Sequence, residues 1–246
     1  MINQTTMNQL HEMHLSYIAK DIRERVCEKS FMELSFEDQI TTIVDREWHR
    51  RKDRKITELI RSAGLCYTNA SAADIDYMAE RKLDKRLINE LSCCGYIMSG
   101  QNIIIMGATG VGKTYLACAL GTAACRERYT TKYARIPSLL EELALAHTDG
   151  TYRKIIQPYR NVRLLILDEW LLSPLETQAA KEIFEIMEYR SAARMSTIFC
   201  SQFDTAEWLE RTCNDLLGES LLDRIVHRSH KIIISGESMR KRQGLQ

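Results

Sequence analysis

The sequence has only three prolines in 246 residues, and none of them precedes Pro137. It also has no low-complexity linker and no internal repeat, which excludes a linker-rich or repeat protein. No apolar run approaches the roughly 20 residues that a membrane-spanning helix needs. The first residues are polar and contain no apolar core like that of a secretory signal, so we expect a cytoplasmic protein.

The eight cysteines are irregularly spaced and contain no C-x-x-C pair. This spacing argues against a disulfide framework and against a zinc site. Apolar residues make up 45% of the chain and charged residues 27%, as in ordinary globular proteins. The length allows one domain of standard size and a smaller appendage.

The net charge of +1 hides two local clusters of basic residues. Residues 46–61 hold seven basic side chains against three acidic ones, and residues 224–242 hold six against one. Such clusters on a near-neutral protein suggest a polyanionic partner, usually nucleic acid, although a solvated helix face explains them equally well. Trp48 lies within the first cluster, where we expect it to be buried on a helical core rather than stacked on a base. The residues predicted to contact DNA are Arg46, Arg50, Arg51, Lys52, Arg54 and Lys55.

The first part of the chain shows helical periodicity, with helices expected over 10–26, 36–60 and 72–91. From residue 101 the pattern changes to strands that alternate with helices, which is typical of a parallel sheet covered on both faces. We therefore predict a helical N-terminal domain over residues 1–70 and an α/β domain over residues 71–246. The predicted strands are 102–106, 131–135, 163–167, 197–200 and 231–234.

Residues 107–114 form a complete Walker A loop, G-x-x-x-x-G-K-[ST], between an apolar strand and a helix-prone stretch. Its glycines let backbone N–H groups turn toward a phosphate, and the following helix start favours negative charge. Lys113 would reach the β- and γ-phosphates, and Thr114 would bind Mg²⁺. The sequence thus predicts ATP and Mg²⁺ as ligands, held by Gly107, Ala108, Thr109, Gly110, Val111, Gly112, Lys113 and Thr114.

A second motif, which carries two carboxylates, follows the apolar run 164–167. There Asp168 and Glu169 form a Walker B pair. Asp168 would hold Mg²⁺ together with Thr114, and Glu169 would polarise the attacking water. Gln202 follows the next predicted strand and could orient the same water. Arg224 lies on an apolar helical segment, where it is either an arginine finger for a neighbouring subunit or part of a surface ion pair.

Taken in order, these motifs resemble the IstB/DnaC branch of the AAA+ ATPases, and the IstB side in particular. The resemblance extends to residues 34–37, 47–51, 74–77 and 207–208, to the DRIVH segment at 223–227 and to the GESMR segment at 236–240. It implies a five-stranded P-loop AAA+ sheet behind a small all-helical domain. It also implies an ATPase that helps an insertion sequence to transpose, oligomerises on duplex DNA with little sequence preference, and stimulates a partner transposase.

The resemblance also assigns roles to individual residues. Lys113, Glu169, Gln202 and Arg224 would be catalytic, Gln202 as sensor I and Arg224 as the finger. Tyr96 would contact the adenine, and Arg240 would touch the nucleotide as a sensor II equivalent. The alternative within AAA+ is a DnaC-like loader of a replicative helicase. A regulatory protein without hydrolysis and a small-molecule kinase fit the motifs less well.

Overall fold

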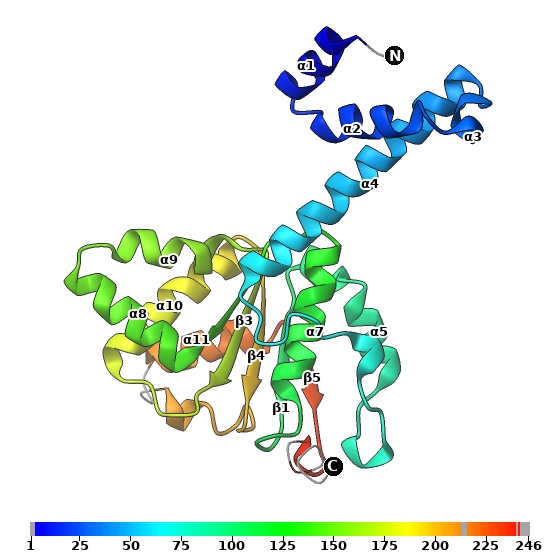
Figure 1. The fold of residues 1–246 in the computed structure, drawn as a ribbon. Helices are drawn as coiled ribbons and strands as arrows, with labels where there is room; N and C mark the ends of the chain where they lie inside the picture. The colour runs from blue at the N-terminus through cyan, green and yellow to red at the C-terminus, as the bar shows by residue number, and fades with distance from the viewer. Residues whose placement is uncertain (1–2, 213–215, 240, 242–246) are drawn as a thin grey trace. The chain divides into compact units, whose positions relative to one another are not determined.

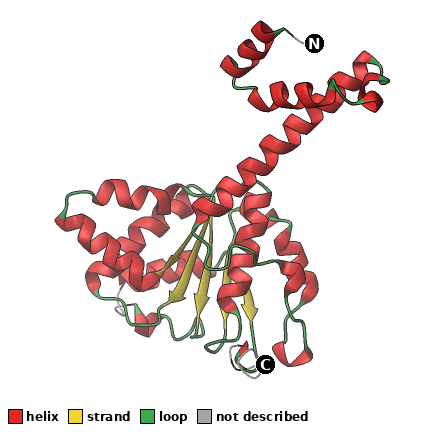
Figure 2. Ribbon diagram, in the orientation of Figure 1, coloured by secondary structure: helices red, strands yellow, loops and turns green. Residues whose placement is uncertain are grey.

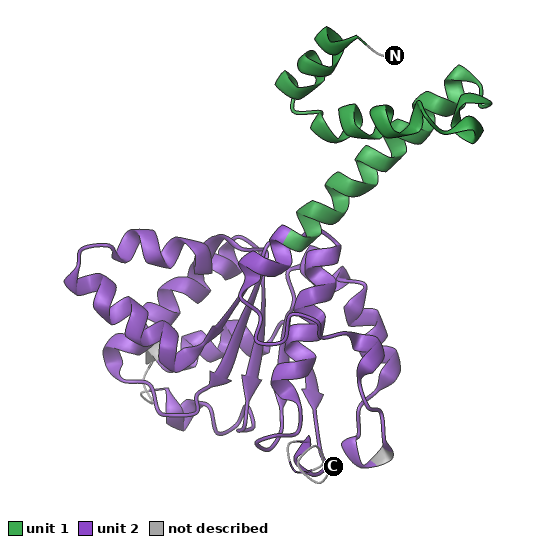
Figure 3. Ribbon diagram, viewed as in Figure 1, with its two compact units in different colours: residues 1–57 green, residues 58–246 purple. Residues whose placement is uncertain are grey.

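The computed structural model describes residues 3–212, 216–239 and 241. The chain forms two compact units, Met1–Thr57 and Glu58–Gln246 (Figure 3). The sequence boundary predicted at residues 70/71 lies beyond the boundary of these units. The division of roles between a DNA- and partner-binding part and an ATPase part stays a prediction.

Helices are the only regular secondary structure among the described residues of the first unit (Figure 2). Its helices are α1 (Gln4–Glu12), α2 (Ser16–Arg25), α3 (Lys29–Met32) and the larger part of α4 (Phe36–Ala63). The single helix expected over 10–26 was wrong, because His14 adopts a left-handed backbone with φ 58°. The amide of Leu15 then bonds to the carbonyl of Leu10, which ends α1 in a Schellman-type turn.

The segment between α4 and the sheet was predicted as one helix over 72–91, and this was also wrong. The structure has two 3₁₀ turns, η1 (Ala72–Asp74) and η2 (Ala79–Arg81), before α5 (Lys85–Ser92) and α6 (Gly95–Ser99). The side chain of Asp76 accepts a bond from the amide of Met78 and so favours a turn over a helix. Asp84 caps the start of α5 in the same way.

A five-stranded parallel sheet forms the centre of the second unit, in the order β2-β3-β4-β1-β5 (Figure 1). This confirms the predicted sheet. Because β4 lies between β1 and β3, the loops that follow these three strands meet at one edge of the sheet. The strands are β1 (Asn102–Met106), β2 (Thr131–Arg135), β3 (Leu164–Trp170), β4 (Ser196–Ser201) and β5 (Ser229–Ile233).

Helices cover both faces of this sheet, and alternate strand residues enter two separate cores. On one face Ile103 and Ile105 pack with α7 (Lys113–Arg126) and α5. On the other face Ile104 packs in a cluster with α8 (Ile136–Thr148), α9 (Tyr152–Asn161), α10 (Thr177–Ala192) and α11 (Leu216–Val226). A 3₁₀ turn, η3 (Leu209–Arg211), precedes α11. Among the described helices, none has both the length and the apolar character needed to cross a bilayer.

Candidate functional site

The loop between β1 and α7 adopts a conformation that its glycines make possible. Gly107 and Gly112 have φ angles of 152° and 100°, which other residues rarely adopt. A Cβ atom on Gly107 would also overlap the carbonyl of Ile234. Gly112 precedes α7 and has no side chain to cap it, so the first amides of the helix are left for an anion.

Lys113 reaches back across this loop. Its ammonium group donates to the carbonyl oxygens of Gly107 at 2.7 Å and Ala108 at 2.8 Å. Burial lowers the pKa of Lys113, while Cys200 and the carboxylate of Asp168 act in the opposite direction. The loop thus holds a buried cation beside the start of a helix, which is an arrangement suited to phosphate.

Thr114 and Asp168, the pair predicted to hold Mg²⁺, are in direct contact. The Thr114 hydroxyl donates to Oδ2 of Asp168 at 2.8 Å, and the amide of Glu169 donates to Oδ1 at 2.9 Å. A hydroxyl and a carboxylate are the oxygen ligands that Mg²⁺ prefers, so these residues fit the ion. They lie at the carboxyl end of β3 and at the start of α7, next to the phosphate loop.

Tyr133 is a member of this cluster that the sequence analysis missed. From β2, its hydroxyl donates to the same Oδ2 atom of Asp168 at 2.8 Å. Burial raises the pKa of Tyr133, and Asp168 raises it further, so the phenol keeps its proton. A tyrosine within a strand gives no sequence signal of this contact, which depends on the pairing of β2 with β3.

Replacing Tyr133 with phenylalanine should raise the Mg²⁺ concentration needed for nucleotide binding by about 10-fold, because outer partners orient metal-binding carboxylates. If Thr114 and Asp168 held the ion, the Tyr133 phenol would orient the Asp168 carboxylate from outside the ligand set. The measurement is a Mg²⁺ titration of fluorescent ATP binding. Tyr152→Phe is the matched control, since Tyr152 makes the same 2.8 Å bond to Glu185 elsewhere. Equal Mg²⁺ requirements for the two variants would contradict the role of Tyr133.

Glu169, the predicted water-polarising residue, is held by Arg135 at the end of β2. The Arg135 guanidinium lies 2.7 Å from Oε1 of Glu169. The other carboxylate oxygen, Oε2, is buried without a partner among the described residues. Glu169 has a left-handed backbone with φ 58°, where the register of β3 and β4 shifts. The strained bulge directs the Glu169 carboxylate away from the regular sheet.

Gln202 lies beside the phosphate loop, as the strand order requires. It follows β4, the strand between β1 and β3, and its side-chain oxygen accepts a 2.9 Å bond from the Thr109 hydroxyl. The predicted residues Lys113, Thr114, Asp168, Glu169 and Gln202 are thus brought to one edge of the sheet.

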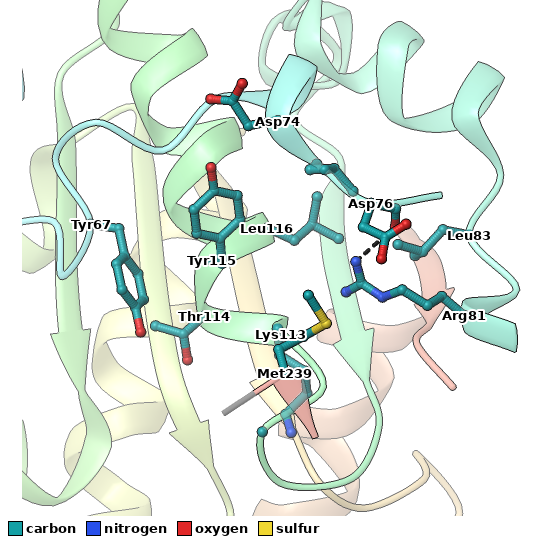
Figure 4. Close-up of a pocket in the computed structure, with 13 residues that line it drawn as sticks. Tyr67, Asp74, Asp76, Arg81, Leu83, Lys113, Thr114, Tyr115, Leu116 and Met239 are labelled. Atoms are coloured by element: carbon teal, nitrogen blue, oxygen red, sulfur yellow. Dashed lines mark hydrogen bonds between the residues drawn. The ribbon is translucent and has the colours of Figure 1, made fainter. Parts of the chain in front are cut away.

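A cavity of about 430 Å³ continues from the phosphate loop (Figure 4). This volume suits a small-molecule ligand. Its far wall comes from the turns before α5, which the sequence analysis did not connect with the nucleotide. The lining residues are Tyr67, Asp74, Ile75, Asp76, Arg81, Leu83, Gly110, Gly112, Lys113, Thr114, Tyr115, Leu116 and Met239.

Arg81 joins that wall to the phosphate loop. One of its guanidinium nitrogens donates to the carbonyl of Asp76 and another to the carbonyl of Val111, both at 2.7 Å. The side chain is buried, and the Arg81 carbonyl accepts a bond from the amide of Ser235 after β5. The wall and the loop therefore form one connected structure around the cavity.

The prediction that Tyr96 contacts adenine does not fit the structure. Tyr96 lies on α6, before β1, whereas the phosphate loop follows the other end of that strand. Its side chain is buried in the core and does not line the cavity. The cavity instead offers the ring of Tyr67 and the apolar side chains of Ile75 and Leu83. Arg240 lies outside the described residues.

Arg224 lies away from the cavity of its own chain. On α11 it pairs with Glu188 at 3.4 Å, and its guanidinium stacks over the ring of Phe184 at 5.3 Å. A small hollow beside it is lined by Gly100 and Asn102, which lie at the start of β1. The opposite end of that strand carries the phosphate loop, so Arg224 does not join the site that its own chain forms.

The basic cluster on α4 includes three arginines that contact carboxylates of the first unit. Glu47 is buried and accepts bonds from Arg50 and Arg51, which lower the pKa of its carboxyl, and Arg46 lies 3.5 Å from Asp21. These three arginines thus have partners within their own unit. The side chains of Lys52, Arg54 and Lys55 are exposed.

Trp48, which was expected to be buried, has 60% of its surface exposed, so that expectation was wrong. The core side of α4 is taken by Ile43 and Glu47 instead. A helix pattern rich in charged residues does not show which side the core will use.

Residues 8–246 match the family described as IstB-like ATP binding protein. The chain is 40% identical over 243 residues to the insertion sequence ATP-binding protein y4pL of Sinorhizobium fredii, covering 99% of this chain and 98% of that protein. It is 38% identical over 206 residues to the insertion sequence IS1162 ATP-binding protein of Pseudomonas fluorescens, covering 84% and 89%.

Solved structures with a similar fold cover about two thirds of the chain. The DnaC helicase loader has a TM-score of 0.59 and 21% identity, covering 68% of this chain and 97% of that one. AMPPCP-bound DnaA from Aquifex aeolicus has a TM-score of 0.59 and 20% identity, covering 70% of this chain and 52% of that one. The present chain therefore spans about half the length of that DnaA chain. These likenesses confirm the P-loop AAA+ fold.

Proposed function

Because the chain belongs to the family of IstB-like ATP-binding proteins, we propose that it is the ATP-dependent DNA-binding helper of an insertion sequence. It oligomerises on duplex DNA and stimulates the partner transposase. The match over 99% of the chain to an insertion sequence ATP-binding protein carries this proposal. The likeness to the DnaC helicase loader, at 21% identity, concerns the fold.

ATP is the substrate that suits the cavity and the loop. The base and ribose occupy the cavity, and the triphosphate follows the loop to the start of α7. Lys113 binds the β- and γ-phosphates, while Thr114 and Asp168 are the ligands for Mg²⁺. When bound, this ion would neutralise charge that develops on the phosphates.

Hydrolysis then needs a water molecule placed in line with the γ-phosphate. Glu169 is the residue we assign to polarise that water, and Gln202 orients it from the end of β4. The Arg135 bond holds one oxygen of the Glu169 carboxylate, which leaves the other oxygen for the water. The products are ADP and phosphate.

Duplex DNA is the proposed partner of Lys52 and Lys55, which are exposed on α4. Replacing Lys52 and Lys55 with glutamine should weaken duplex binding at every sequence. It should also make the fall of log affinity with log salt concentration less steep, by about 2 in slope, since each lost phosphate contact removes about 1. The measurement is fluorescence anisotropy with a labelled duplex over a range of salt concentrations.

The matched control replaces Lys154 and Lys181, which are exposed on α9 and α10, and causes the same change in net charge. An equal slope for both double variants would indicate that Lys52 and Lys55 lie on a solvated helix face and do not contact DNA. Competition between unlabelled duplex and single-stranded DNA separates the two candidate functions. A strong preference for the single strand would favour the helicase loader.

A further inference from the structure

Two carbonyl oxygens of the phosphate loop, residues 107–114, are bonded by residues that lie far from it in the sequence. The Val111 carbonyl accepts a 2.7 Å bond from the buried guanidinium of Arg81, which belongs to η2. The Gly110 carbonyl accepts a 2.9 Å bond from the amide of Met239. The loop is thus held by one partner that precedes β1 and by another that follows β5.

Segment 234–239, which follows β5, runs against the phosphate loop. A Cβ atom on Gly110 would overlap the Ser238 hydroxyl, so the two backbones are too close there for a further side chain. The same segment bonds to the cavity wall, because the Ser235 amide donates to the Arg81 carbonyl at 3.1 Å. Arg81 therefore connects the wall, the loop and segment 234–239.

The two carbonyl bonds also constrain the amides of the loop. A trans peptide group points its carbonyl and the amide of the next residue in opposite directions. The bond that fixes the Val111 carbonyl therefore fixes the amide of Gly112, and the bond that fixes the Gly110 carbonyl fixes the amide of Val111. Amides of such a loop are the groups that bind phosphate oxygens.

Lys113 differs from these two partners. Its bonds to the carbonyls of Gly107 and Ala108 come from within the loop, and the ammonium group must leave them to meet a phosphate. The bonds from Arg81 and Met239 do not compete with the ligand, because phosphate oxygens do not bind carbonyl oxygens. A donor that holds a carbonyl outward also keeps its negative end away from the phosphates.

We propose that Arg81 and the amide of Met239 are positioning groups for phosphate binding. By holding two loop carbonyls outward, they direct the amides of Val111 and Gly112 to the phosphates. Both Arg81 and Met239 also border the cavity, so a role toward the base must be separated from a role toward the phosphates (Figure 4). The inference rests on the proposed binding of ATP at this site, and it makes phosphate affinity depend on the cavity wall and on segment 234–239.

Binding of tripolyphosphate with Mg²⁺ tests Arg81, because this probe has phosphates but no base to contact the cavity wall. Arg81→Met keeps the length of the side chain but has no donor. It should raise the Kd for tripolyphosphate by about 10-fold, since the buried Val111 carbonyl loses a charged partner. Arg81→Lys keeps one charged donor and should lose less affinity. Isothermal titration calorimetry measures each Kd.

Leu83→Ala is the matched control for Arg81→Met. Leu83 belongs to the same wall and is half-buried, but its side chain cannot donate a hydrogen bond. This control should weaken the binding of ATP more than that of tripolyphosphate, whereas Arg81→Met should weaken both. The melting temperature without nucleotide checks that each variant is folded.

A pair of variants at Met239 tests the second bond. Proline lacks the amide that donates to Gly110, while Met239→Ala loses the same side chain and keeps that amide. Met239→Pro should bind tripolyphosphate about 5-fold more weakly than Met239→Ala. Because Met239 is only partly buried, this pair also tests the proposal if Arg81→Met does not fold.

Equal Kd values of Arg81→Met and Leu83→Ala for tripolyphosphate would overturn the role of Arg81. Equal values for the two Met239 variants would overturn the role of its amide. Either result, with a wild-type chain that binds both ATP and tripolyphosphate, would leave the proposed function intact. A wild-type chain that binds neither compound would overturn the proposed function together with this inference.

Discussion

Replacing Lys113 with alanine should abolish ATP binding, with a loss of affinity of at least about 100-fold. The ammonium group lies between two carbonyl oxygens of the phosphate loop, at 2.7 and 2.8 Å. Charge-assisted bonds to phosphate are among the strongest polar contacts, and Lys113 is the one cationic side chain within residues 107–114 of the phosphate loop. Titration with a fluorescent ATP analogue measures the loss.

Lys181→Ala, an exposed substitution on α10, is the control and should bind ATP normally. The melting temperature of Lys113→Ala without nucleotide should stay close to that of the wild type. If the folded Lys113→Ala variant bound ATP with wild-type affinity, the phosphate-binding role of Lys113 would be wrong.

Glu169→Gln should separate binding from hydrolysis. The glutamine can still accept the Arg135 bond through its amide oxygen, so ATP binding should persist. Turnover should fall by about 10²–10⁴-fold, because an amide does not polarise water as a carboxylate does. An ATP-loaded oligomer should accumulate and be visible by size-exclusion chromatography. Normal turnover would remove Glu169 from the catalytic role.

Arg224→Ala should bind ATP nearly normally and hydrolyse it about 10³–10⁵-fold more slowly. Of Lys113, Thr114, Asp168, Glu169 and Gln202, only Lys113 carries a positive charge that can meet the charge developing on the γ-phosphate. Arg224 lies away from the cavity of its own chain, on a helix surface where it pairs with Glu188. This location fits an arginine that a neighbouring subunit supplies.

Mixing Arg224→Ala with Lys113→Ala tests action between subunits. One protein keeps a sound nucleotide pocket and the other keeps a sound arginine, so mixed oligomers should recover part of the ATPase activity. Absence of recovery at every mixing ratio, in subunits shown to co-assemble, would leave Arg224 as a structural ion-pair residue.

Arg160→Ala is the matched structural control for Arg224→Ala. Arg160 also pairs with a carboxylate, that of Glu185, and lies over the ring of Tyr189. Removing either arginine breaks a surface ion pair worth at most about 1 kcal/mol. Both variants should therefore stay folded, and only Arg224→Ala should lose turnover. Equal losses would indicate a general structural effect.

The amino-acid sequence alone determined the strands, the phosphate loop and the Walker B carboxylates. Each of these depends on neighbours in the chain: apolar runs predict buried strands, and the glycines allow the backbone of the loop to turn. The helix predicted between α4 and the sheet was wrong, because Asp76 sets a turn and Asp84 caps α5 within the expected helix. Local hydrogen bonds of this kind compete with helical periodicity.

The tertiary structure decided which side chains complete these motifs. Tyr133 meets Asp168 and Arg135 meets Glu169 because β2 lies beside β3, a neighbour relation that no local pattern encodes. Packing likewise brought the turns around Arg81 to the phosphate loop and left Tyr96 buried at the far end of β1. It also placed Ile43 rather than Trp48 against the helical core, because a helix with apolar residues on more than one side can bury only the side that its neighbours cover.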